Sequence, residues 1–112
     1  MTQYQNSKQY DLEERTYNFA VACRVLVKEL PKTTASLEDG KQLIRSSGSI
    51  AANYIEANES LSKKDFLLRL RIARKEAKET VLWLRLLGAN EKLIDEASQI
   101  KKILSTIIDK SV

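Results

Sequence analysis

Apolar residues recur along most of the chain at alternating steps of four and three, the spacing that places them on one face of an α-helix. Only three glycines and one proline interrupt the 112 residues, so the helices are predicted to be long. The composition, 43% hydrophobic and 30% charged, is that of a globular protein, and a chain of this length has room for one core. The sequence therefore predicts an all-α protein with a single domain.

Capping residues mark the ends of four predicted helices. Asp11, Ser36 and Ser62 are each followed three residues later by an acidic residue, a common pattern at a helix N-terminus. Gly88 suits the C-terminal cap of the third helix, and Asn90 can cap the start of the fourth. The predicted helices are residues 11–30, 37–58, 62–87 and 90–110.

The predicted connections are only about two to five residues long, and links of this length join antiparallel neighbours. We therefore predict an up-down-up-down four-helix bundle over residues 11–110, preceded by a flexible N-terminal segment, residues 1–10. Gly48 lies inside the second helix, where glycine is unfavourable. It indicates either close contact with another backbone or a local kink.

The available side chains disfavour most enzyme classes. The chain has no histidine, the usual proton carrier near neutral pH, and its three glycines do not form a phosphate-binding loop. Cys23, the single cysteine, lies among apolar residues and is predicted to be a buried structural thiol. We expect no catalytic residues, no cofactor and no small-molecule substrate.

Several polar residues of the second and third helices are predicted to fix how the helices pack. Asn53 and Glu56 lie three positions apart beside the inward apolar stripe of the second helix and are expected to reach a neighbouring helix. The carboxylates of Glu56, Glu76 and Glu79 can converge on a metal ion, but ion pairs with Arg45 or Arg74 are favoured. We assign structural roles, and no metal, to Asn53, Glu56, Glu76 and Glu79.

No part of the sequence approaches the roughly 18 to 20 consecutive apolar residues that cross a bilayer, and the polar start lacks a secretory signal. The expected compartment is the cytoplasm, with no membrane partner. Binding of the third helix to an anionic membrane surface is the least favoured hypothesis, because acidic residues flank its second apolar surface.

The third predicted helix has a second apolar surface on the side opposite its core stripe. A patch of this kind on a monomer usually marks a contact with a partner. The alternative is a helix central in its own bundle, with both faces covered by neighbours. We predict an oligomer interface that contains Leu68, Ile72, Leu82, Trp83 and Leu86.

The same helix carries most of the positive charge. Residues 62–87 hold eight basic and three acidic side chains, a net charge of +5 against +4 for the whole chain. A charged face of this kind is often simply solvated, but it can also bind phosphates or dock head to tail on a second subunit. If RNA or DNA is the partner, the predicted binding residues are Arg71, Arg74, Lys75, Lys78 and Arg85.

Three motifs resemble a bacterial family of four-helix bundles, the 23S rRNA intervening-sequence proteins. They are residues 45–57 (RSSGSIAANYIEA), residues 62–66 (SKKDF) and residues 70–80 (LRIARKEAKET). Residues 11–12 and 83–87 are also similar. The resemblance implies an antiparallel bundle that assembles into a homopentameric ring. Many relatives are encoded in intervening sequences within large ribosomal RNA genes.

A more distant structural relative is the accessory variability protein of diversity-generating retroelements, a basic pentamer that binds nucleic acid and a reverse transcriptase. Its sequence is not closely similar to this chain, and the resemblance supplies no catalytic residues. The leading hypothesis is a non-catalytic homo-oligomer that assembles through the third helix. The alternative is a protein that binds RNA or DNA without sequence preference through the basic stripe.

Overall fold

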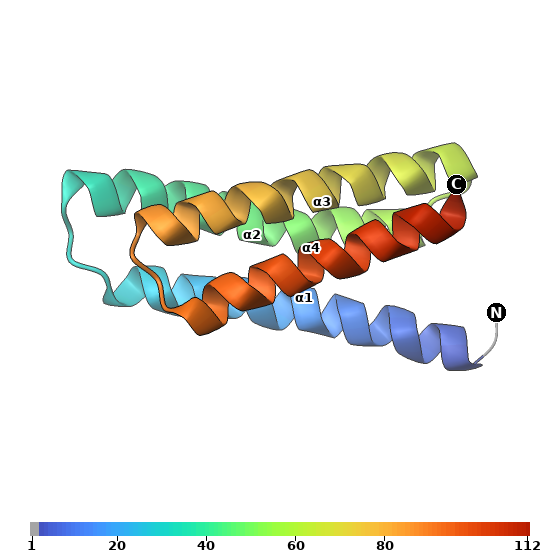
Figure 1. Ribbon diagram of the computed structural model, residues 1–112, viewed down its shortest axis with the longest axis horizontal. Coiled ribbons are helices and arrows are strands. Elements are labelled where there is room, and N and C mark those ends of the chain that lie inside the picture. Colours follow the sequence, from blue (N-terminus) through green and yellow to red (C-terminus); the bar gives the residue numbers. More distant parts are fainter. Residues whose placement is uncertain (1–2) are drawn as a thin grey trace.

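The computed structural model is a rod of four antiparallel helices (Figure 1). It describes the backbone of residues 3–112 and the side chains of residues 12–112. Within this part of the chain there is no strand, and the predicted all-α up-down-up-down bundle is confirmed. The helices are α1 (Gln3–Glu29), α2 (Thr34–Asn58), α3 (Lys63–Leu86) and α4 (Glu91–Ser111).

The first two helices begin earlier than predicted. Helix α1 starts at Gln3 rather than at Asp11, since no proline or glycine precedes Asp11 to interrupt a helix. Thr33 is the N-cap of α2, because its hydroxyl accepts a hydrogen bond of 3.1 Å from the amide of Ser36. The predicted cap at Ser36 is therefore wrong, and Ser36 lies in the first turn. Residues 1–2 lie outside the described part, and the flexibility of residues 1–10 stays a prediction.

The other two helix starts are confirmed. The Ser62 hydroxyl accepts a hydrogen bond of 3.1 Å from the amide of Asp65, and the Asn90 side chain accepts one of 2.9 Å from the amide of Leu93. These side chains satisfy amide groups that have no carbonyl partner in the first turn. The predicted N-caps of α3 and α4 are therefore the observed ones.

Gly88 ends α3 in the manner predicted. Its φ angle is +70°, in the left-handed region that glycine adopts without a steric penalty. The amide of Gly88 donates to the Arg85 carbonyl at 3.1 Å, and the amide of Ala89 donates to the Leu84 carbonyl at 2.9 Å. This pair of hydrogen bonds is the Schellman motif. It reverses the chain directly into α4.

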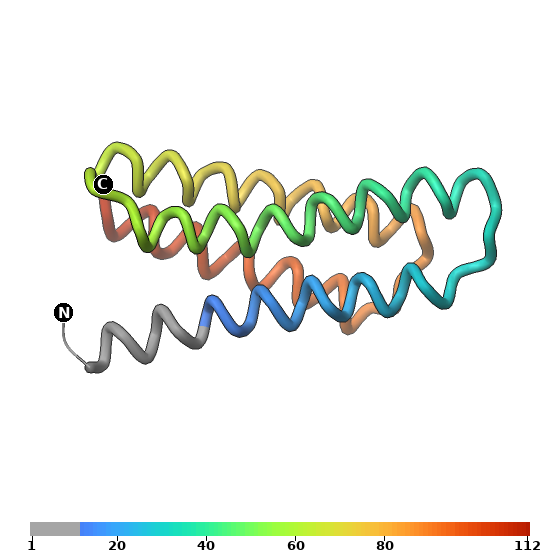
Figure 2. Tube along the Cα trace, turned by 180° about the vertical axis from the view of Figure 1, so that it is seen from behind, coloured from blue at the N-terminus to red at the C-terminus, as the bar shows by residue number. Residues whose placement is uncertain are grey.

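The four helices pack as a square in which each contacts two neighbours. Helix α2 lies between α1 and α3, helix α4 lies between α3 and α1, and within the described residues the backbones of diagonal helices do not approach each other closely (Figure 2). The interface of α2 with α3 is the largest, and that of α1 with α4 is the smallest. The largest fully buried apolar side chains are Leu43, Ile50, Leu70, Leu84, Ile100 and Leu104.

Gly48 does not mark a close contact between backbones, so that prediction is wrong. A Cβ atom at this position would lie 3.2 Å from Nη2 of Arg24, the flexible end of a side chain on α1. Helix α2 continues through Gly48. The position is therefore an ordinary helix-interior site beside a mobile group.

Alanine at the two glycines is expected to have opposite effects on stability. Gly88→Ala should lower the free energy of unfolding by about 1 to 2 kcal/mol, because an L side chain is strained in the left-handed region. Gly48→Ala should raise it by up to about 1 kcal/mol through helix propensity. Urea denaturation followed by circular dichroism measures both changes. Equal effects of the two substitutions would contradict this assignment.

Candidate functional site

Hydrogen bonds between polar side chains link α2 to α3. The residues involved, Arg45, Ser46, Glu76 and Thr80, are called the polar seam. Nη1 of Arg45 donates to a carboxylate oxygen of Glu76 at 2.8 Å, and the Glu76 residue is only 5% exposed. Deeper in the bundle, the Thr80 hydroxyl lies 2.8 Å from that of Ser46 and 2.7 Å from the Glu76 carbonyl oxygen. Because these groups have fixed partners, they set the register of the two helices.

Three of the four predicted structural residues lie in or beside this seam. Asn53 donates to the Ser49 carbonyl at 3.0 Å and accepts from Arg69 of α3 at 3.4 Å. Glu76 forms the predicted pair with Arg45, and Glu79 lies next to Glu76. Glu56 is exposed, and its expected contact with a neighbouring helix stays a prediction.

The electrostatics of Glu76 reflect its partners. Burial alone raises the pKa of this carboxyl, but hydrogen bonds from Arg45 and Ser49 stabilise the charged form, and the net pKa is lower than its ordinary value. Among the described residues, no group of three or more acidic or cysteine side chains is arranged to hold a metal ion.

Cys23 is completely buried in the core, as predicted. Burial raises the pKa of its thiol to about 11, since the thiolate is poorly solvated there. A thiol with this pKa is almost entirely protonated at neutral pH and is a weak nucleophile. Cys23 is therefore a packing residue.

The predicted apolar surface of α3 divides into two parts. Leu68, Leu82 and Leu86 are 49%, 47% and 58% exposed and define the outer surface of α3. Ile72 and Trp83 are half-buried, and Trp83 packs against the hydrophobic core. The spacing of residues on one helix did not reveal this burial, because it depends on how closely the neighbouring helix approaches.

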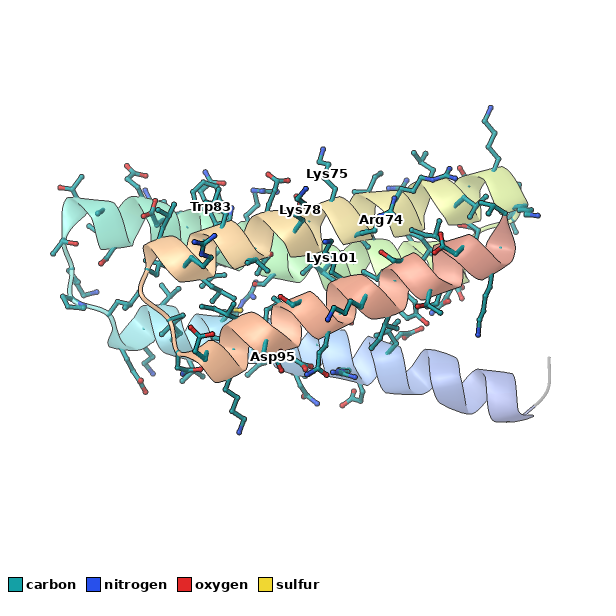
Figure 3. All side chains as sticks on the ribbon, in the orientation of Figure 1. Arg74, Lys75, Lys78, Trp83, Asp95 and Lys101 are labelled. Carbon is teal, nitrogen blue, oxygen red and sulfur yellow. The ribbon has the colours of Figure 1, made fainter. Side chains whose placement is uncertain are left out.

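The predicted basic residues also lie on α3, and a lysine of α4 joins them. Figure 3 shows Arg74 and Lys78 on the side of the bundle that also carries Lys101 of α4, whereas Lys75 points outward from α3. Arg71 and Arg85 are exposed as well. Within residues 12–112, none of these side chains forms a salt bridge. Sequence reasoning missed Lys101 because its charged neighbours belong to a different helix.

A further surface, absent from the sequence predictions, runs along the contact of α1 with α4. The two helices leave an open groove of about 840 Å³ between them. Val25, which is 51% exposed, is the exposed apolar side chain of α1 that lines this groove. The periodicity of a single helix did not reveal the groove, because it forms between two helices that are far apart in the sequence.

These features describe a helical bundle that carries exposed apolar and charged side chains on its outer surfaces. No helix in the described part of the chain is long and apolar enough to span a membrane. The profile of the 23S rRNA-intervening sequence protein family matches residues 8–110, and the chain therefore belongs to that family. The resemblance seen in the sequence motifs is confirmed.

A solved relative has the same fold. It is a protein of unknown function from the S23 ribosomal protein family of Bacteroides thetaiotaomicron VPI-5482, whose crystal structure was determined at 1.70 Å resolution. The two sequences are 34% identical, and the superposition has a TM-score of 0.81. It covers 91% of this chain and 98% of the relative. No curated protein shows significant similarity to this chain.

The lowered pKa of Glu76 leads to a pH-dependent contribution to stability. Because the folded state binds its proton less tightly than the unfolded state, the contribution is present above the unfolded pKa of about 4.3 and is lost as the pH falls through the folded pKa. Glu76→Gln should therefore reduce the difference between the unfolding free energies at pH 7 and pH 3. Glu56→Gln, at an exposed carboxylate, is the matched control. Identical pH profiles for Glu76→Gln and the wild type would refute this account.

Proposed function

We propose that this protein is a non-catalytic, homo-oligomeric helical bundle that assembles through the outer surface of α3. One observation supports the proposal most strongly: Leu68, Leu82 and Leu86 are each about half exposed on a helix whose opposite side already fills the core. Large apolar side chains exposed along one side of a helix are typical of contact surfaces. Five copies in a ring is the proposed number, and it rests on the family resemblance. The proposed compartment is the cytoplasm.

The three leucines can supply only part of the binding energy. Complete burial of a leucine contributes about 1.5 to 3 kcal/mol, so burying the exposed halves of three contributes about 2 to 4 kcal/mol. The entropic cost of association alone is about 4 kcal/mol or more. A stable oligomer therefore needs a larger counterpart surface, on which other apolar and charged contacts form.

Charge on the outer surface of α3 is expected to break the assembly. The double variant Leu82→Glu and Leu86→Glu should sediment as a single chain of 12.8 kDa at concentrations where the wild type has about five times that mass. Ile55→Glu, which alters a similarly exposed side chain on α2, is the matched control and should keep the wild-type mass. Circular dichroism verifies that all variants remain helical. A wild type that is monomeric at high micromolar concentration would refute the proposal.

A second candidate function is the binding of RNA or DNA without sequence preference. The observation that favours it is that Arg74 and Lys78 of α3 lie on the same side of the bundle as Lys101, which comes from a different helix (Figure 3). Such a group can bind phosphates and release their counterions. Trp83, the aromatic side chain nearest to it on α3, is half-buried, so base stacking does not contribute. A ring would repeat the group and add weak contacts together.

Nucleic-acid binding of this kind should depend steeply on salt. Fluorescence anisotropy with a labelled RNA of mixed sequence should show affinity falling as salt rises from 50 to 200 mM. The salt slope should decrease by about one for each phosphate contact removed. Arg74→Glu with Lys78→Glu should abolish binding, whereas Lys28→Glu with Lys41→Glu, the same change in net charge at exposed sites on α1 and α2, should reduce it only slightly. Binding that survives the double reversal, or that ignores salt, would exclude this function.

A further inference from the structure

The groove between α1 and α4 has an apolar floor. Phe19, Ala22 and Leu26 of α1 line one side, and Leu93 of α4 lines the other. Val25, at the edge of the groove, is 51% exposed. The groove exists because α1 and α4 share the smallest helix contact in the bundle. Of the apolar side chains that line it, Phe19 is buried, Ala22, Leu26 and Leu93 are partly buried, and Val25 is exposed.

The rim of this groove is acidic. Four carboxylates and two basic side chains line it, and one of these bases is already paired. Arg15 donates two hydrogen bonds of 2.8 Å to Glu96 across the groove, so the charges of this pair are mutually satisfied. The remaining side chains have a net negative charge. They are Glu14, Glu29, Asp95 and Lys92.

The outer surface of α3 complements this groove in charge. Residues 63–86 hold eight basic and three acidic side chains, and Arg71 and Lys75 lie among the exposed leucines. The outer surface of α3 is therefore apolar with basic neighbours, and the groove between α1 and α4 on the same molecule is apolar with an acidic rim. Contact between two α3 surfaces would instead bring like charges together, which is unfavourable.

The outer surface of α3 is long enough to span the groove. At 1.5 Å per residue, the part of α1 that lines the groove, from Glu14 to Glu29, is about 22 Å long. The same rise places Leu68 and Leu86, the two ends of the outer surface of α3, about 27 Å apart.

We infer that the groove between α1 and α4 is the docking site for the outer surface of α3 from a second copy of this chain. The inference rests on the proposed assembly and names the counterpart surface that the leucines of α3 require. Helix α3 adjoins α4, so the two surfaces are not on directly opposite sides of the rod. Repetition of this head-to-tail contact turns by a fixed angle at each step and can close into a ring.

Two variants, each blocked at one surface, test the inference. The first carries Leu82→Glu and Leu86→Glu on α3, and the second carries Val25→Arg and Glu29→Lys at the groove. All four sites are exposed, and circular dichroism verifies the helicity of each variant. Ile55→Arg with Glu56→Lys, at two exposed sites on α2, makes the same change in charge and is the matched control for the groove variant.

Each blocked variant alone should sediment as a single chain, and the control should keep the wild-type mass. An equimolar mixture of the two variants should form a complex with twice the mass of one chain. The reason is that the intact groove of the α3 variant can receive the intact α3 of the groove variant, while the blocked surfaces prevent further growth.

The other outcomes separate this inference from the proposed function. If the groove variant keeps the wild-type mass while the α3 variant is monomeric, assembly through α3 stands and docking in the groove is refuted. If both variants dissociate but their mixture stays monomeric, the contact is not head to tail and the inference fails. A wild type that is monomeric overturns both. Loss of the assembly on nuclease treatment would show that nucleic acid holds the copies together, which also overturns the inference.

Discussion

The close packing of α2 against α3 organises the rest of the bundle. Small side chains, among them Ser46, Ala73 and Ala77, are completely buried and allow the two backbones to approach. The pair of Arg45 with Glu76 then fixes the register at the solvent edge of the contact. Because α1 and α4 pack on the outer sides of this pair, their own mutual contact is the smallest in the bundle. The groove between them follows from the same arrangement.

Helix α3 therefore has two different roles on two of its sides. Toward the core, Leu70 and Leu84 are fully buried, whereas on the outside Leu68 and Leu86 remain about half exposed. The inner side fills the core of the bundle. In the proposed assembly the outer side contacts a second copy, and its basic neighbours favour an acidic counterpart surface such as the groove between α1 and α4.

Much of the fold was predictable from the sequence because helix periodicity and capping are local properties. The caps at Ser62, Asn90 and Gly88 were identified correctly, since each depends on hydrogen bonds within a few residues. The start of α2 was misplaced because both Thr33 and Ser36 are good caps and nothing local selects between them.

The predicted site was less accurate because it depends on packing between helices. Trp83 was placed on an outer surface by its angular position, but it packs against the core. Lys101 and the groove were missed because each involves residues from two helices far apart in sequence. Glu76 was predicted well, since its expected partner Arg45 lies on the adjacent helix in a simple antiparallel bundle.

The central claim is that single chains of this bundle do not remain alone, and native mass spectrometry of the unmodified protein tests it most directly. The account predicts one dominant species at five times the 12.8 kDa chain mass, which dissociates by loss of single chains. A spectrum that contains only the 12.8 kDa chain across the micromolar range would contradict it.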